Sequence, residues 1–308
     1  MQCPKRRLPL ARPGWRMATT AAAALCRRPI LASFWACALL IIASGHLVAR
    51  AQAQGAAAGG AKAPVSAIRL YVLDGGTIVG RNLERYNLWN EPRDLSVAVF
   101  LVVHPKGVLL FDTGLGDRYL DGREKPSDPA YTVHRTIASQ LAEIGYLTTD
   151  VTYLAISHMH GDHVGNANNF AGATWLVQKA ERDAMFLARN QDNYIKLKDN
   201  KTIVLNGDHD VFGDHTVVLQ STPGHTPGHQ CLLVTLPTTG AVLLTGDLYH
   251  YPEERLYHRF PNFEPDLTSS AASRAKIEAL VQKTRARMWI HHDIVNYDKL
   301  MKSPLYYE

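Results

Sequence analysis

Cysteine is nearly absent from this sequence once its first fifty or so residues are set aside. Three of the four cysteines, Cys3, Cys26 and Cys37, lie in that stretch, and only Cys231 lies beyond it. A single thiol cannot form an internal disulfide, so we expect a hydrophobic core and bound metal to stabilise the fold. Cys231 lies in the strand-like run 230–234, where a thiol is more often a small buried hydrophobe than a nucleophile.

Acidic residues are absent from the first 53 positions, although eight Lys and Arg lie there. The uncharged stretch 29–49 follows the basic segment and ends at two small-x-small cleavage patterns, Ala49-Arg50-Ala51 and Ala51-Gln52-Ala53. This order is typical of a secretory signal peptide. The sequence therefore predicts three segments: a signal peptide at 1–53, a flexible mature N-terminus at 54–66 and a single folded domain at 67–308, exported to the periplasm or secreted.

Two alternatives concern this leader. The uncharged stretch 29–49 is long enough to remain as an uncleaved membrane anchor, but Gly45 and the Ala-rich exit favour cleavage, which would leave no membrane anchor. Arg27-Arg28 loosely resembles a twin-arginine signal, so the export route, general or twin-arginine, stays open. Met17 is an alternative start.

An excess of basic residues is also missing from the predicted mature chain. The whole chain has 33 Lys and Arg, eight of them before residue 54, which leaves 25 basic against 28 acidic residues. The high isoelectric point therefore belongs to the leader. No basic surface is predicted, so a nucleic-acid partner is not expected.

Histidine, in contrast, is concentrated in His158-Met159-His160-Gly161-Asp162-His163, directly after the apolar run 151–156. The run predicts a buried strand. His158 and His160 point to the same side of an extended backbone, and Gly161 permits a sharp turn towards a second point. Imidazole and carboxylate are ligands for zinc and similar metals, so one loop can supply two metals.

Three later strands also end in residues of the metal-binding type. His225 lies in the rigid loop 221–229, Asp247 follows the strand 242–244, and 291–293 reads His-His-Asp after the strand 288–290. Because sites are often built from loops at one edge of a sheet, we expect these four strand ends to meet.

Other polar positions remain ambiguous from sequence. Asp112 follows the strand 108–111, where it either caps the following loop or orients a group in the site. The Asp208-His209-Asp210 sequence is explained by a turn rather than by a metal. Residues 67–73 predict a strand closed by a turn at 74–76, and 81–94 predict a loop.

The four motifs together resemble the metallo-β-lactamase superfamily, over roughly residues 67–300. The matching segments are His158–His163, Thr222-Pro223-Gly224-His225, Leu244-Thr245-Gly246-Asp247 and His292-Asp293. The resemblance implies an α+β fold, an αββα sandwich of two mixed β-sheets flanked by helices.

The resemblance also implies a set of ligands for two metal ions, with Zn²⁺ expected. His158, His160 and His225 would hold the first metal, Asp162, His163 and His292 the second, and Asp247 would bridge them. The family's last ligand directly precedes an Asp, which favours His292 over His291. His229 is then expected to support a ligand rather than to act as one.

Within the superfamily, the spacing from His225 to Asp247 is similar to that of the N-acyl homoserine lactone lactonases, the quorum-quenching branch. Asp247 argues against the secreted β-lactamases, which lack a bridging carboxylate. One departure concerns a Tyr that these lactonases place three residues after the bridging Asp, where this chain has His250. Tyr249, Tyr251 or His250 is therefore expected to assist catalysis, and the sequence does not select among them.

The resemblance implies a metal-dependent hydrolase whose metal-bridging hydroxide opens a lactone ring, with an N-acyl homoserine lactone as the expected substrate. Asp162 is expected to take and return the proton. The alternatives are hydrolysis of a β-lactam, a thioester or a phosphotriester on the same scaffold. The expected partner is a small ester or lactone, and whether the chain is a monomer or a homodimer stays open.

Overall fold

The computed structural model describes residues 66–120 and 130–308. The predicted signal peptide and nearly all of the predicted flexible N-terminus lie outside these residues. Among the residues that are described, no helix is long and apolar enough to cross a membrane.

The larger sheet has seven strands in the order β4-β1-β2-β3-β5-β6-β7. Their bounds are β1 (Arg69–Asn82), β2 (Pro92–His104), β3 (Gly107–Phe111), β4 (Ala130–Thr132), β5 (Tyr153–Ala155), β6 (Thr174–Gln178) and β7 (Thr202–Leu205). Strands β4, β1, β2 and β3 are antiparallel, whereas β3, β5, β6 and β7 are parallel, so the sheet is mixed.

The smaller sheet has five strands in the order β12-β11-β10-β9-β8. Their bounds are β8 (His209–Asp210), β9 (Val217–Ser221), β10 (Gln230–Leu236), β11 (Gly240–Leu244) and β12 (Arg287–Trp289). Strands β11 and β12 are parallel and the other neighbours are antiparallel. Strands β9, β11 and β12 therefore all end at the same edge of this sheet.

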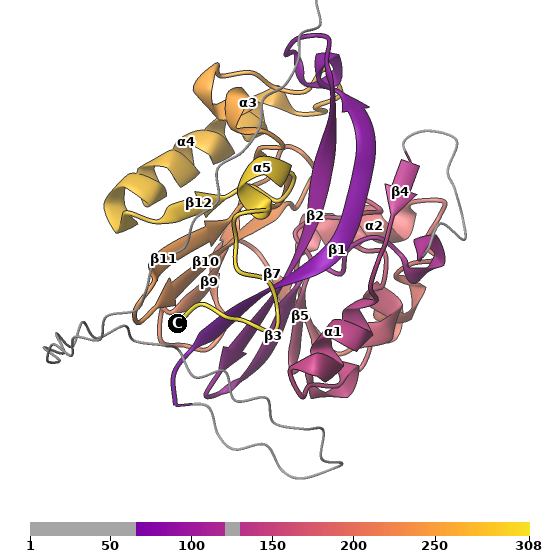
Figure 1. Ribbon diagram of the computed structural model, residues 1–308, viewed down its shortest axis with the longest axis vertical. Coiled ribbons are helices and arrows are strands. Elements are labelled where there is room, and N and C mark those ends of the chain that lie inside the picture. Colours follow the sequence, from indigo (N-terminus) through magenta and orange to yellow (C-terminus); the bar gives the residue numbers. More distant parts are fainter. Residues whose placement is uncertain (1–65, 121–129) are drawn as a thin grey trace, which may run out of the picture. The chain divides into compact units, whose positions relative to one another are not determined.

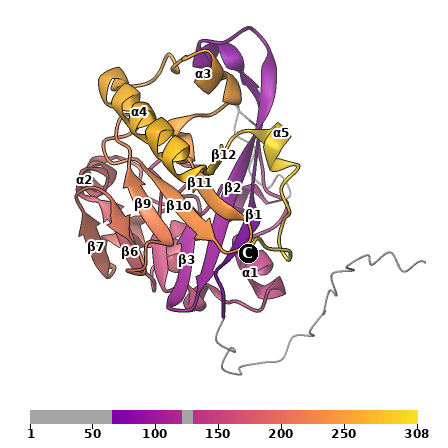
Figure 2. The same ribbon diagram turned by 90° about the vertical axis from the view of Figure 1, so that its left-hand side faces the viewer.

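Helices cover the outer faces of both sheets (Figures 1 and 2). They are α1 (Ile137–Glu143), α2 (Lys179–Leu187), α3 (Pro252–Leu256), α4 (Leu267–Thr284) and α5 (Ile294–Tyr297). Short 3₁₀ segments are η1 (Leu83–Tyr86), η2 (Asp117–Tyr119), η3 (Thr148–Asp150), η4 (Ala167–Phe170), η5 (Ile195–Asp199) and η6 (Gly246–Leu248). Helix α4 begins where the Asp266 side chain accepts a hydrogen bond from the Ser269 amide at 3.0 Å, a typical N-cap.

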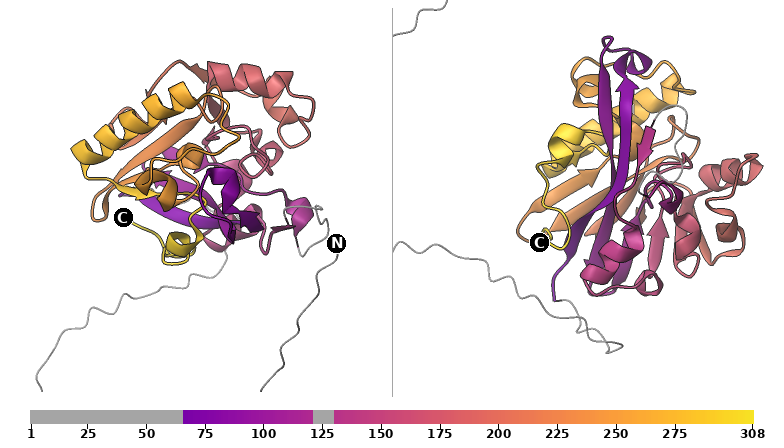
Figure 3. Two further views of the ribbon diagram at one scale, coloured as in Figure 1. Left: turned by 90° about the horizontal axis from the view of Figure 1, so that it is seen from above. Right: turned by 45° about the vertical axis from the view of Figure 1, so that its right-hand side comes forward.

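Alternate side chains along a strand point to opposite faces of its sheet, one towards the other sheet and one towards the covering helices. In β10, Leu232 and Val234 belong to the core between the sheets, whereas Cys231 and Leu233 pack with Ile277 of α4 on the outer face. Figure 3 (right) shows α4 on one side of the sheets and α1 and α2 on the other. The αββα sandwich is confirmed, and Cys231 is fully buried, as predicted for a small hydrophobe.

The sequence-based boundaries were wrong in the first hairpin. The expected turn at 74–76 is an irregularity inside β1, because the pairing of β1 with β2 continues from Asp74↔Ala98 to Thr77↔Ser96. Gly76 has φ +116°, a conformation that other residues rarely adopt. Strand β1 therefore runs on to Asn82, and the expected loop 81–94 contains the end of β1, η1 and the start of β2.

Candidate metal centre

Four loops at one edge of the sandwich bring the predicted metal-binding residues together. Strands β5, β9, β11 and β12 each end directly before one of these loops. The seven side chains that meet there are His158, His160, Asp162, His163, His225, Asp247 and His292. Of these, only His160 and Asp162 are not buried, so the cluster opens to solvent on their side.

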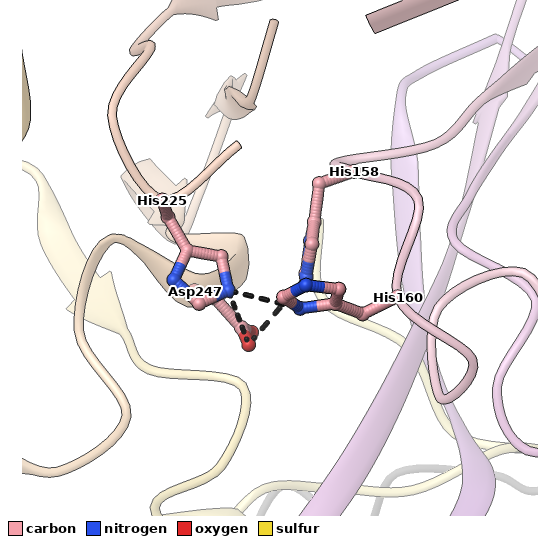
Figure 4. Close-up of side chains that lie close together, drawn as sticks. All are labelled: His158, His160, His225 and Asp247. Atoms are coloured by element: carbon pink, nitrogen blue, oxygen red, sulfur yellow. Dashed lines mark hydrogen bonds and ion pairs between the residues drawn. The ribbon is translucent and has the colours of Figure 1, made fainter. Parts of the chain in front are cut away.

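The first group of donors consists of His158, His160, His225 and Asp247, whose candidate ligand atoms all lie within 4.8 Å of one another. The Nε2 atom of His225 is 3.1 Å from Nδ1 of His160 and 3.4 Å from Oδ2 of Asp247. Figure 4 shows the three imidazoles converging on the Asp247 carboxylate. Such spacing suits ligands that share one metal ion.

The second group consists of Asp162, His163 and His292, again within 4.8 Å. It faces the other oxygen of Asp247, because Oδ1 lies 3.1 Å from Nε2 of both His163 and His292. Asp247 therefore presents one carboxylate oxygen to each group, which is the arrangement a bridging ligand requires. His291 is not in this group.

The protein alone leaves several of these atoms unsatisfied. Nε2 of His158, Nε2 of His163 and Oδ1 of Asp247 are buried and have no hydrogen-bond partner. Buried polar atoms are normally hydrogen-bonded, so three buried atoms that lie around Asp247 without a hydrogen bond indicate a missing ligand. Burial lowers the pKa of His158 well below its ordinary value, which keeps its imidazole neutral and able to bind a metal. The residues present thus fit the predicted metal site.

Asp112 orients two histidines from behind the cluster. Its Oδ2 lies 2.9 Å from Nδ1 of His163 and 3.1 Å from Nε2 of His291, and its Oδ1 accepts the Ser157 amide at 2.6 Å. The residue is fully buried and has φ +63°, a strained conformation for Asp. Of the two interpretations left open by the sequence, the structure favours the one in which Asp112 orients the site.

Glu264 and His229 support His225 and Asp247, respectively. Nδ1 of His225 lies 3.1 Å from Oε2 of Glu264. His229 accepts the Asp247 amide at its Nε2, 3.0 Å away, and its Nδ1 lies 2.8 Å from the Thr222 hydroxyl. His229 thus contacts the backbone of Asp247 and is not one of the candidate metal ligands. The contact between Glu264 and Nδ1 of His225 fixes the orientation of the His225 ring, because Nδ1 is the ring nitrogen that does not face the cluster.

Glu181 of α2 connects the two loops that carry most of the histidines. Its carboxylate accepts the Met159 amide at 2.7 Å and the Gly228 amide at 2.8 Å. The side chain is 1% exposed, and burial raises its pKa. Because backbone amides of both loops bind one carboxylate, Glu181 sets the distance between His158–His163 and His225.

The structure distinguishes the three residues that the sequence could not rank. His250 faces the cluster: its Nε2 lies 3.2 Å from Oδ2 of Asp247, and its Nδ1 lies 3.1 Å from Oε1 of Glu254. Tyr249 points away, because its hydroxyl donates to Glu278 at 3.1 Å beside a cavity of about 860 Å³. Tyr251 is buried with its hydroxyl unpaired.

The Asp208-His209-Asp210 sequence forms no metal site among the described residues. Asp210 instead accepts hydrogen bonds from the amides of Phe212, Gly213 and His215, so it closes a turn, as the sequence predicted. Asp208 pairs with Lys276 on α4.

The match to a family model decides the classification of this fold and cluster. Residues 92–288 match the model described as the metallo-beta-lactamase superfamily. The chain belongs to this superfamily. It is therefore a member of a family of metal-dependent hydrolases, as the resemblance implied.

Similar proteins of this superfamily are lactonases. The N-acyl homoserine lactonase AttM of Azorhizobium caulinodans is 30% identical over 270 residues, which cover 78% of this chain and 99% of the relative. The N-acyl homoserine lactonase AiiA of Bacillus thuringiensis subsp. kurstaki is 31% identical over 214 residues, 65% of this chain and 82% of the relative. The predicted likeness to the lactonase branch is confirmed.

Solved structures show the same likeness. A mutant of B. thuringiensis AiiA with N-decanoyl-L-homoserine bound at its active site superposes with a TM-score of 0.67 and 26% identity. The alignment covers 79% of this chain and all of that chain. An N-acyl homoserine lactone hydrolase with the product N-hexanoyl-L-homoserine at its catalytic metal centre gives the same TM-score at 25% identity and 79% coverage of this chain.

The sequence did not reveal the carboxylates that support the cluster. Glu181, Glu254 and Glu264 are each buried or nearly so, and each contacts one of the loops or histidines from another element. Only Glu254 left a signal, because it follows His250 by four residues at the start of α3, the spacing of neighbours on a helix.

Proposed function

We propose that this chain is a dinuclear metal hydrolase that opens the lactone ring of N-acyl homoserine lactones. The observation that carries the proposal is the convergence of four loops on Asp247, whose two carboxylate oxygens face two separate groups of donors. The likeness of 78% of the chain to an N-acyl homoserine lactonase supports the choice of substrate.

In this proposal, His158, His160 and His225 would hold one divalent cation, Asp162, His163 and His292 would hold the other, and Asp247 would contribute to both sites. Two such cations, with Zn²⁺ expected, would supply polarisation of a carbonyl oxygen and activation of water at neutral pH. The carboxylates of Asp112 and Glu264 keep His163 and His225 in the required orientation.

Asp162 is the residue proposed to move the proton. Its side chain is 17% exposed, more than that of Asp247 at 5%, and it lies on the open side of the cluster. Its Oδ2 is 3.4 Å from Nε2 of His292 and 3.7 Å from Nε2 of His163, so one oxygen remains for the reacting group. A carboxylate in this place can take a proton from the attacking water and return it to the leaving alcohol.

His250 is the residue proposed to orient the substrate. Glu254 holds its Nδ1, and Arg274 in turn donates to Glu254 at 2.8 Å. All three side chains are buried, so His250 is fixed with its Nε2 towards the cluster. A fixed ring in this position can hydrogen-bond the ester group that the reaction opens.

We also propose that the chain works in the periplasm or outside the cell. The support comes from the sequence: a basic segment without acidic residues, an uncharged stretch and two small-x-small patterns before residue 54. N-terminal sequencing of the protein from the culture medium or periplasm tests this directly. A start near residue 50 is expected, and a full-length cytoplasmic chain would contradict the proposal.

The activity is tested with three substrates on metal-replete enzyme: an N-acyl homoserine lactone, the β-lactam nitrocefin and the phosphotriester paraoxon. The lactone is expected to be hydrolysed fastest. Preferred hydrolysis of nitrocefin or paraoxon would replace the lactonase proposal with another reaction of the same superfamily.

A further inference from the structure

A group of hydrogen-bond donors lies beside the metal cluster without a role in holding it. It consists of Arg81 at the end of β1, Tyr86 in η1, and Tyr251 before α3, and we call it the donor cluster. The hydroxyl of Tyr251 and Nε of Arg81 are buried and have no hydrogen-bond partner. Each of these unpaired donors is unusual, because burial without a partner is costly.

The donor cluster is continuous with the site through its rings. The Tyr86 ring lies 4.8 Å from the ring of His250 and 5.0 Å from that of Tyr251, centre to centre. Tyr86 and Tyr251 are 3% and 1% exposed, so both phenols are held in place. His250 joins the two regions, because its Nε2 also lies 3.2 Å from Oδ2 of Asp247.

Arg81 links the phenols of this region. Burial raises the pKa of Tyr86, Tyr131 and Tyr251, and in each case Arg81 opposes the shift. The strand pairing agrees with this: Arg81 lies opposite Arg93, whose guanidinium is 5.5 Å from the centre of the Tyr251 ring.

Arg93 lies opposite Arg81 on β2 and, unlike Nε of Arg81, has a partner for its guanidinium. It forms an ion pair with Glu253 at 2.7 Å. The unpaired Nε is thus a property of Arg81 and not of the strand pair.

We infer that Arg81, Tyr86 and Tyr251 form a subsite for an uncharged carbonyl acceptor on the acyl side of the lactone ring. The inference rests on the proposed function, since it identifies the part of that substrate which lies outside the metal cluster. In an N-acyl homoserine lactone this acceptor is the amide carbonyl, which a simple alkyl lactone lacks.

The charges of the region favour a neutral acceptor over an anion. His250 contacts both the Tyr86 ring and the Asp247 carboxylate, so an anion bound here would lie close to a negative group. A carbonyl oxygen accepts two hydrogen bonds and adds no charge, which suits phenol and guanidinium donors. The subsite therefore favours substrates that carry a carbonyl acceptor next to the lactone ring.

The test compares two lactones on the full-length, metal-replete enzyme. One is an N-acyl homoserine lactone, and the other is a γ-alkyl lactone of similar length without the amide. The variants are Tyr251→Phe, Tyr86→Phe and Arg81→Met, which remove donors and keep most of the packing. Arg135→Met and Tyr257→Phe are matched controls: Arg135 pairs with Glu143 of α1, and Tyr257 is 53% exposed.

Each donor variant is expected to lower kcat/KM for the amide substrate about 10-fold, mainly through KM, and to change the alkyl lactone less than about 2-fold. The controls should leave the ratio of the two substrates unchanged. Equal losses on both lactones, or no loss on either, would overturn the subsite. A wild-type enzyme that hydrolyses neither lactone would instead overturn the proposed function, so the two failures are distinguishable. Thermal unfolding of each variant checks that the fold is intact.

Discussion

The metal cluster and the donor cluster lie side by side, but they are built in different ways. Each metal-cluster residue lies on a loop or short 3₁₀ segment that directly follows a strand, and Asp112, Glu181 and Glu264 hold these segments in place. The donor cluster comes from β1, η1 and the segment before α3, and two of its donors have no partner. In our proposal, the first group is completed by two metal ions, and the second is completed by a substrate.

This difference separates chemistry from specificity. Metal ligands must hold fixed distances, so they lie on rigid strand ends in short motifs. Residues that recognise a substrate need only present donors or apolar surface, so they can come from any element that reaches the site. Substitutions in the metal cluster should therefore abolish turnover for every substrate, and substitutions in the donor cluster should change which substrate is preferred.

Asp247→Ala should have the largest effect. Removing the carboxylate shared by both groups leaves the imidazoles of His163 and His292 without their common partner, so metal content and turnover fall together. We expect kcat/KM to fall about 1,000-fold or more for all lactones. Elemental analysis and initial rates measure both effects.

The control for this substitution is Asp208→Ala, at a residue paired with Lys276 outside the site. Full metal content and wild-type rates in Asp247→Ala would show that Asp247 does not join the two groups.

Asp162→Asn should retain most of the metal and lose about 100-fold in kcat, since the amide can still bind but cannot move a proton. The measurement is turnover per bound metal, with the metal content determined on the same sample. Unchanged turnover in a metal-replete sample would refute the proton-transfer role of Asp162.

His250→Gln should lower kcat about 10-fold, because it removes a ring that Glu254 holds towards Asp247. Tyr249→Phe is the matched neighbour, with its hydroxyl on Glu278, and should change kcat less than about 2-fold. Steady-state rates on one lactone compare the two. A larger loss in Tyr249→Phe than in His250→Gln would reverse our assignment.

Glu181→Gln should have the smallest effect on turnover and act on stability instead. Met159 and Gly228 donate to different oxygens of Glu181, and Gln has an NH2 group in place of one of them, so one buried amide loses its acceptor. We expect a loss of about 1–3 kcal/mol in the free energy of unfolding, measured by urea denaturation. Glu143→Gln, at an exposed position, serves as the control, and equal stability of the two variants would contradict the role of Glu181.

The sequence predicted the sandwich and the location of the metal cluster because both depend on local patterns. Each motif is shorter than about ten residues and follows an apolar run, so strand ends could be recognised and their meeting at one edge inferred. His292 rather than His291 lies in the cluster, as the motif implied, since His291 is turned towards Asp112.

The donor cluster and the β1–β2 hairpin could not be predicted in the same way. Gly75-Gly76 is a common turn signal, but here the partner strand β2 continues past it and keeps β1 extended. Tyr86 lies in a 3₁₀ turn without hydrophobic periodicity, and its importance depends on contacts with His250 and Tyr251, which lie far away in the sequence. Such tertiary contacts leave no pattern in a single sequence.

The central claim is that two groups of side chains, joined by Asp247, hold a pair of metal ions that the enzyme needs. The most direct measurement is metal content per chain together with lactone hydrolysis, before and after removal of metal by a chelator and after addition of Zn²⁺. We predict two bound ions per chain, loss of hydrolysis on chelation and recovery with Zn²⁺. Hydrolysis that persists in metal-free protein would contradict the account.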